Sequence, residues 1–207
     1  MSESLELLWA WTPFLLTGFY WNIVIAVLAT VIGTGIGALL ALMRLSSSRL
    51  LAGGAGVVIS FFRNVPSLVL LFYAATFLPN ELSLWGSQVP LPDWLKAALA
   101  LSGSPIGFTA LNLHSSLLQW RRNERGAAML FFPNWLGGFM ITVLASSTAS
   151  LVGVNELVGR CNTVIAASST IFMFPVYVYA LCLFFAFCYP FSLVLGNLKN
   201  VMEKRYS

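Results

Sequence analysis

Long apolar runs separated by short polar turns dominate the hydropathy pattern of this chain. The runs fall at about 14–43, 50–78, 95–118, 136–154 and 171–195. A helix that crosses the hydrocarbon core of a bilayer needs about 20 mostly apolar residues. A membrane barrel would instead show alternating segments of about ten residues. The pattern therefore predicts an all-α polytopic membrane helix bundle of about five transmembrane helices, forming a single transmembrane domain over 1–207.

Helix-disturbing residues interrupt two of these runs. In the second run, the segment FRNVP at 62–66 contains Pro66, which removes a backbone donor and disfavours helical geometry at Val65. A charge such as Arg63 in mid-bilayer costs about 3 kcal/mol or more. We therefore expect an interfacial helix up to Arg63, a kink, and then the membrane-crossing part. The third run is broken by Gly-Ser-Pro at 103–105, and the proline-rich stretch 79–94 predicts a loop.

Two glycines in the first run have the spacing of a helix-packing motif. Gly33 and Gly37 lie one turn apart on the same helical face. Small residues at this spacing let a second helix approach closely. The alternative is that both glycines are simply tolerated in a membrane helix.

Composition and charge agree with a membrane protein and give it an orientation. The chain is 58% hydrophobic and 9% charged, whereas soluble domains carry about 25% charged residues. The net charge of +4 is spread among loops, so it does not indicate nucleic-acid binding. One side of the predicted bundle collects Arg44, Arg49, Arg121, Arg122, Arg125, Lys199, Lys204 and Arg205, with Arg63 close by, whereas the other has only Lys96 and Arg160. Because Lys and Arg favour the cytoplasmic side, we expect the N-terminus outside, the C-terminus in the cytoplasm, and a cytoplasmic loop at 119–138.

Catalytic motifs are missing from the sequence. It contains no H-E-x-x-H, no phosphate-binding G-x-x-x-x-G-K-[ST], and no metal-ligand spacing among its cysteines. The hydroxyls at 146–150 could supply a nucleophile, but such groups in membrane helices usually bond a carbonyl one turn back or a neighbouring helix. His114 is either a proton relay or ligand, or an interfacial histidine. We therefore expect a non-enzyme that binds no metal or cofactor itself.

Three segments resemble one protein family. ALMRLSSS at 41–48 and FFRNVPSLVLLFYAATFLP at 61–79 are similar to the permease subunits of ABC importers for polar amino acids, of the histidine/glutamine/arginine type. FMITVLASSTASLVGVNEL at 139–157 resembles the family stretch that ends in Gly-Val-x-Glu-Leu. The three segments occur in the family's order and the resemblance extends over most of the chain.

The resemblance implies a type I ABC importer-like permease in the bacterial cytoplasmic (inner) membrane. Its partners would be ABC ATPase subunits, which bind ATP and Mg, a second permease subunit, an extracytoplasmic solute-binding protein, and membrane lipid. Nucleic acid is not expected as a partner. The loop at 119–138 would be the coupling loop that contacts the ATPase, with contacts from Arg121, Arg122, Glu124, Arg125, Gly126, Ala127 and Ala128. Candidate pathway or gate residues are Arg63, Asn64, Pro66, Asn112, His114, Ser146, Ser147 and Glu156.

The sequence also departs from the family pattern. The coupling loop is shortened and its Glu-Ala-Ala motif is degenerate, because Gly126 stands at the acidic position and Phe132 at a later glycine. Apolar Leu111, Leu144 and Ala145 replace charged family residues. These changes predict a heterodimer whose other half makes most solute contacts, and we expect Ala127 and Ala128 to pack against an ATPase. The alternative is a permease-derived scaffold or regulatory subunit that binds partners without transporting.

Overall fold

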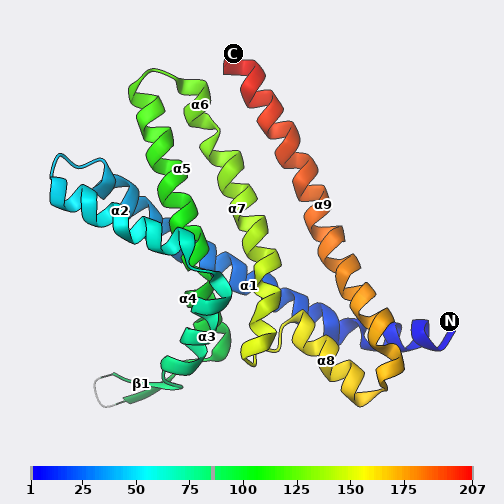
Figure 1. Cartoon of the computed structure of the whole chain (residues 1–207). Helices are drawn as coiled ribbons and strands as arrows, with labels where there is room; N and C mark the ends of the chain where they lie inside the picture. Colours follow the sequence, from blue (N-terminus) through cyan, green and yellow to red (C-terminus); the bar gives the residue numbers. More distant parts are fainter. Residues whose placement is uncertain (1, 85–86, 207) are drawn as a thin grey trace.

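A computed structural model describes residues 2–84 and 87–206 of the chain. Its elements are α1 (Ser2–Arg44), α2 (Arg49–Asn64), α3 (Ser67–Phe77), β1 (Glu81–Leu84), β2 (Ser87–Pro90), α4 (Asp93–Leu101), α5 (Gly103–Arg121), α6 (Arg125–Met129), α7 (Phe131–Ala145), a 3-10 helix η1 (Ser146–Val152), α8 (Leu157–Ala167), a short 3-10 helix η2 (Thr170–Phe172) and α9 (Met173–Tyr206). The long α1 runs across α5, α7 and α9 (Figure 1). The expected helical membrane bundle is confirmed.

The glycine pair of α1 packs directly against α5. A Cβ atom on Gly33 would lie 2.4 Å from Cβ of Pro105, and one on Gly37 would lie 2.8 Å from the carbonyl oxygen of Ile106. Even a Cβ atom at these two positions would clash with α5. The helices can therefore approach this closely only because both positions are glycine. The predicted close-packing role of Gly33 and Gly37 is confirmed.

The proline of the second apolar run breaks its helix, as expected. Val65 and Pro66 have extended backbone between α2 and α3, and the two helices are bent by 96°. The break is held by α5, because a Cβ on Gly107 would lie 3.0 Å from the backbone nitrogen of Arg63. The second run is therefore a sharply bent pair of helices that packs on α5.

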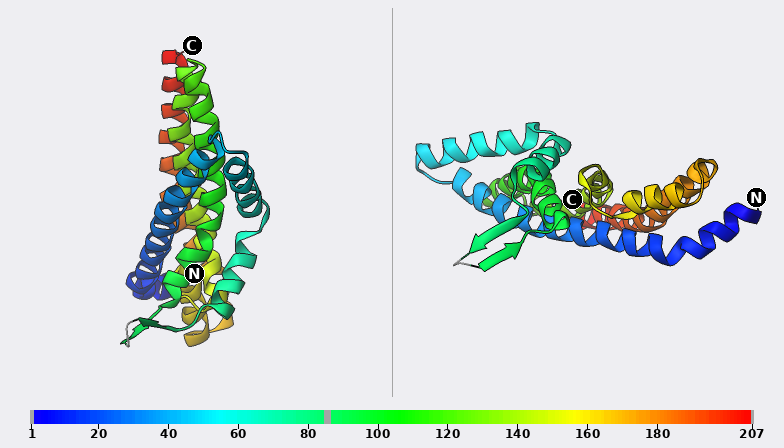
Figure 2. Two further views of the ribbon diagram at one scale, coloured as in Figure 1. Left: turned by 90° about the vertical axis from the view of Figure 1, so that its left-hand side faces the viewer. Right: turned by 90° about the horizontal axis from the view of Figure 1, so that it is seen from below.

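The segment 79–94 is not simply a loop. Strands β1 and β2 pair antiparallel with Glu81 opposite Pro90 and Leu84 opposite Ser87, which leaves a two-residue connection of the usual hairpin length. Pro90 is compatible with this pairing because it ends β2, and both strands of a two-stranded sheet are edge strands, where a missing donor is tolerated. The hairpin projects from the lower end of the molecule in Figure 1 and in the left view of Figure 2.

The expected loop at 119–138 is mostly helical. Helix α5 continues to Arg121, α6 occupies Arg125–Met129, and α7 begins at Phe131. Residues 127–130 (Ala, Ala, Met, Leu) are good helix formers, so the helical turns extend beyond the charged residues that suggested a loop. The fourth run is also divided, because its second half forms the tighter η1.

Three helical stretches are long and apolar enough to cross a membrane: Glu3–Arg44, Arg125–Val152 and Thr170–Met202. Counting the bent α2–α3 pair as one span gives up to four among the described residues. The segment expected as a third span, 95–118, is split between α4 and α5 at Ser102 and is not among them. Polar residues such as Asn112 and His114 lower the hydropathy of the segment 95–118. Within the bundle, α5 packs against α1, α2 and α7.

Candidate functional site

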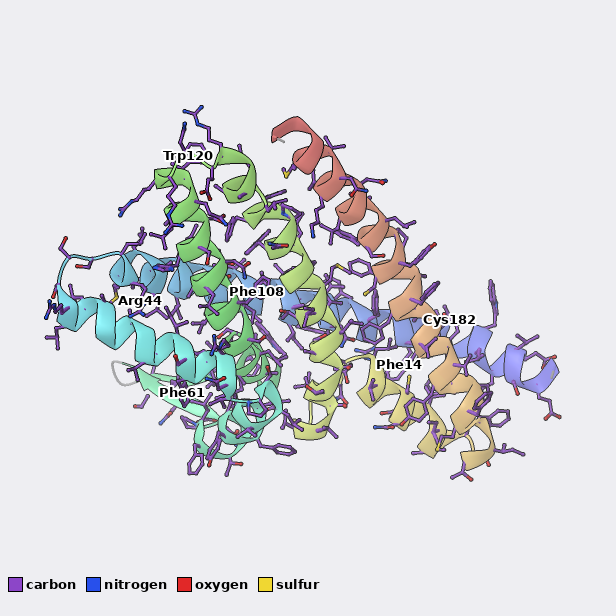
Figure 3. All side chains as sticks on the ribbon, turned by 45° about the horizontal axis from the view of Figure 1, so that its top comes forward. Phe14, Arg44, Phe61, Phe108, Trp120 and Cys182 are labelled. Atoms are coloured by element: carbon purple, nitrogen blue, oxygen red, sulfur yellow. The ribbon has the colours of Figure 1, made fainter. Side chains whose placement is uncertain are left out.

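The charged turn between α5 and α6 forms an exposed basic end of the molecule. Arg121, Arg122, Glu124 and Arg125 are all exposed. Asn123 makes the sharp reversal with a φ of 65°, a left-handed conformation that asparagine tolerates better than most residues. Figure 3 shows Trp120 at this end, and the adjoining α6 lies beside the C-terminal part of α9. The predicted coupling residues are therefore gathered at one tip.

The two alanines of α6 have different environments. Ala128 is buried, with 7% of its surface exposed, whereas Ala127 is only half-buried. Gly126 is also half-buried, and the guanidinium of Arg125 lies 5.8 Å from the centroid of the Trp120 ring. Ala128 faces the interior of this chain, and the expectation that the two alanines pack against an ATPase stays a prediction. Of the two, Ala127 is available for contact.

A buried polar cluster joins α1, η1 and α8 at the other end of α7. The Asn22 amide nitrogen donates to Oγ of Ser146 at 3.0 Å and to Oε2 of Glu156 at 2.8 Å. The backbone N–H of Leu157 donates to Oδ1 of Asn22 at 3.0 Å. All three polar side chains are fully buried. Asn22 therefore ties two of the predicted pathway residues, Ser146 and Glu156, to the long first helix.

Glu156 also starts α8. Its carboxylate accepts hydrogen bonds from the backbone N–H groups of Val158 at 3.0 Å and Gly159 at 3.1 Å, which are otherwise unpaired donors of the first helical turn. Glu156 lies outside the spanning segments, and burial raises the pKa of its carboxyl, while the hydrogen bonds from Val158, Asn22 and Gly159 act in the opposite direction. Glu156 therefore caps the N-terminus of α8 and connects this helix to Asn22 of α1.

Arg160 of α8 makes further contacts between α8 and α1. Its Nη1 donates to the carbonyl of Phe14 at 2.8 Å and its Nε to the carbonyl of Asn155 at 3.1 Å. The guanidinium also lies 4.5 Å from the centroid of the Phe14 ring. A Cβ on Gly18 would lie 2.7 Å from Cδ of Arg160, so the absence of a side chain there permits the contact. Helices α1 and α8 are thus held together by several independent contacts.

Two further pathway candidates, Arg63 and His114, share a cavity with Arg44. The cavity has a volume of about 250 Å³ and lies between the end of α1, α2 and α5, and its lining consists of Arg44, Gly56, Ile59, Ser60, Arg63, Leu111 and His114. Nη1 of Arg44 donates to the carbonyl of Ala52 at 2.7 Å. The site is separate from the Asn22 cluster, so the predicted pathway residues do not form one group.

The remaining pathway candidates bond locally. Asn64 donates to the carbonyl of Ser60 at 2.7 Å, and Asn112 to that of Phe108 at 2.9 Å. The Ser147 hydroxyl donates to the carbonyl of Leu144 at 2.7 Å, and Pro66 forms the break between α2 and α3. In η1, the hydroxyls of Ser146, Thr148 and Ser150 likewise donate to carbonyls three residues back. The expectation that these hydroxyls bond one turn back is confirmed.

Sequence reasoning missed Asn22. The signal was present, because Asn22 is a polar amide within the apolar run 14–43, and polar residues inside membrane helices usually have a specific partner. Within residues 2–84 and 87–206, no three His, Cys, Asp or Glu side chains come close enough to hold a metal ion.

Comparison with known proteins supports the fold. No protein-family model matches this chain. The structure is similar to one described as the crystal structure of an amino acid ABC transporter with histidines, with a TM-score of 0.74. The similarity covers 95% of each chain at 19% sequence identity. At this identity the match establishes the fold alone, a helical membrane bundle like that of the amino acid ABC transporter.

Proposed function

We propose that this chain is the membrane permease subunit of an ATP-driven importer. It would form half of a translocation pathway for polar amino acids or related small solutes in the bacterial cytoplasmic membrane. The observation that carries this proposal is the similarity of the fold, over 95% of both chains, to an amino acid ABC transporter. The three sequence segments that resemble polar amino-acid permeases support the same assignment independently.

In this proposal the tip formed by α6 contacts an ATPase subunit. Helix α6 packs against α5, α7 and α9, so a force on the tip would reach three helices at once. Helix α7 leads directly into η1, whose first residue, Ser146, belongs to the Asn22 cluster. Closure of the ATPases on ATP would therefore move α7 as a lever relative to α1. The ATP and Mg would be bound by the ATPase subunits, and this chain would remain non-catalytic.

We further infer that the subunit works as a heterodimer with a second permease and receives solute from an extracytoplasmic binding protein. Leu111, Leu144 and Ala145 replace charged residues of the family, and Leu144 is exposed on α7. A pathway wall of this kind offers few contacts to a charged solute. The second subunit would then supply most of the recognition.

Reconstitution tests the proposal directly. The chain would be co-expressed with a P-loop ATPase and a second permease encoded beside its gene, and the complex placed in proteoliposomes. We expect ATP-dependent amino-acid uptake and solute-stimulated ATP hydrolysis when the binding protein is added. Equal uptake by a homodimer of this chain would contradict the heterodimer inference while leaving the permease role intact.

The alternative function is a permease-derived scaffold or regulatory subunit. The degenerate coupling loop, with Gly126 in place of the family's glutamate, is the observation that favours it. A scaffold would be retrieved with membrane partners but without an ATPase, and its deletion would leave uptake by the remaining subunits intact.

A further inference from the structure

The cavity between α1, α2 and α5 is lined by two arginines and a histidine. Arg44, Arg63 and His114 reach it from three different helices, and no acidic residue is among its lining residues. The ion pair recorded in the described part of the chain, between Lys96 and Asp93, lies elsewhere. Two guanidinium groups around one cavity favour the binding of an anion between them.

The two arginines differ in how they are held. Arg44 is fixed over α2, because Gly56 has no side chain and a Cβ there would lie 2.6 Å from Nη1 of Arg44. Its bond to the Ala52 carbonyl is to a neutral acceptor, so the positive charge is not compensated. For Arg63, no side-chain hydrogen bond or ion pair is recorded to any residue in 2–84 or 87–206. Donors suited to bidentate binding of a phosphate or carboxylate are therefore available.

Exposed apolar side chains of α2 begin beside the cavity lining. Val57, next to the lining residue Gly56, is 72% exposed, and Phe61, one turn further on the same face as Val57, is 52% exposed. Phe61 and Arg44 are both labelled along this part of the molecule in Figure 3. An anion whose attached chains are apolar could place its charge in the cavity and its chains against these residues. The distribution of Lys and Arg puts Arg44 on the expected cytoplasmic side, where anionic headgroups are recognised by basic pockets between helices.

We propose that this cavity binds the phosphate of an anionic phospholipid headgroup. Arg63 and His114 contact the phosphate, Arg44 contributes fixed positive charge, and the acyl chains lie along the exposed apolar face of α2. Gly56 is required because it lets the Arg44 guanidinium lie at the cavity.

Native mass spectrometry of the purified full chain, with any subunits that co-purify, tests this site. The protein would be mixed with phosphatidylglycerol or phosphatidylcholine of matched acyl chains. We expect retention of phosphatidylglycerol in preference to phosphatidylcholine. Because a charge-assisted hydrogen bond contributes enough for about a tenfold change in affinity, Arg63→Gln should weaken phosphatidylglycerol binding about tenfold, and His114→Asn should weaken it by a smaller factor.

The control variant is Arg49→Gln, which removes the same charge from the exposed first turn of α2, outside the cavity lining. Its phosphatidylglycerol binding should match that of the unmodified protein. Equal losses in Arg49→Gln and Arg63→Gln would indicate diffuse attraction and overturn the site, as would equal retention of both lipids. Binding of inorganic phosphate alone with the same dependence on Arg63 would assign the cavity to a soluble anion and overturn the lipid assignment.

Discussion

The two ends of α7 are built in opposite ways. At one end, the turn between α5 and α6 carries Arg121, Arg122 and Arg125, which are all exposed. At the other end, Asn22, Ser146 and Glu156 are fully buried and hydrogen-bonded to one another or to backbone. The polar groups at the buried end are paired within the chain, whereas the charged groups at the other end are exposed. In the proposed permease, the buried end would anchor α7 and the exposed end would contact a partner.

The largest effect should come from breaking the anchored end. Asn22→Leu removes three hydrogen bonds, including the one that Asn22 donates to the Glu156 carboxyl, which should destabilise the protein by about 3 kcal/mol. Thermal unfolding in detergent would measure the loss. Asn112→Leu is the matched control, because Asn112 bonds only the carbonyl of Phe108 in its own helix, and it should cost less than about 1 kcal/mol. Equal losses would show that the Asn22 cluster is not special.

The next prediction separates the two alanines of the exposed end. Ala127→Glu should reduce solute-stimulated ATP hydrolysis by about tenfold, equivalent to about 1.4 kcal/mol of lost coupling, and leave thermal unfolding unchanged. Ala128→Glu should lower the unfolding temperature as well, because its side chain would enter the interior as an unpaired charge. Identical behaviour of the two variants in both assays would remove the distinction between them.

A pH dependence is expected at the anchored end. Because the folded-state pKa of Glu156 is raised, the folded protein holds this proton more tightly than the unfolded chain. Its contribution to stability is therefore present below the ordinary value of 4.5 and is lost as pH rises through the raised pKa. Glu156→Gln should flatten this part of the stability profile. Parallel profiles for the variant and the unmodified protein would be the opposite result.

The smallest effect should come from the exposed end. Arg125→Gln removes the contact with the Trp120 ring, which contributes about 0.5 kcal/mol at an exposed site. Stability in detergent should therefore change little, and association with an ATPase should become less sensitive to salt because one surface charge is lost. A large loss of stability would show that Arg125 makes a structural contribution beyond its exposed contact with Trp120.

Sequence reasoning succeeded where the signal is local. The spacing of Gly33 and Gly37 raised a close-packing role as one of two alternatives, and the structure supports it. The break at Pro66 follows from the geometry of proline itself. The hydroxyl bonds of η1 were also expected, since a serine in a membrane helix has few other acceptors within reach.

Features that depend on long-range contacts were not predicted. Asn22 and Glu156 are 134 residues apart, so nothing near either residue identifies the other as its partner. The three prolines in 79–94 indicated a loop, so the β1–β2 hairpin was not expected. The inward position of Ala128 depends on how α6 packs against α5 and α9. In each case tertiary contacts decided an outcome that local composition left open.

Site-specific photo-crosslinking at position 127 tests most directly whether the α6 tip docks on an ATPase. A photoreactive residue would replace Ala127 in cells that carry all subunits, with the same residue at Leu82 of the β1–β2 hairpin as the control. We predict a covalent adduct between position 127 and a subunit with a P-loop, identified by peptide sequencing, and no such adduct from position 82. An ATPase adduct from position 82 with none from position 127 would contradict the proposed orientation and coupling role.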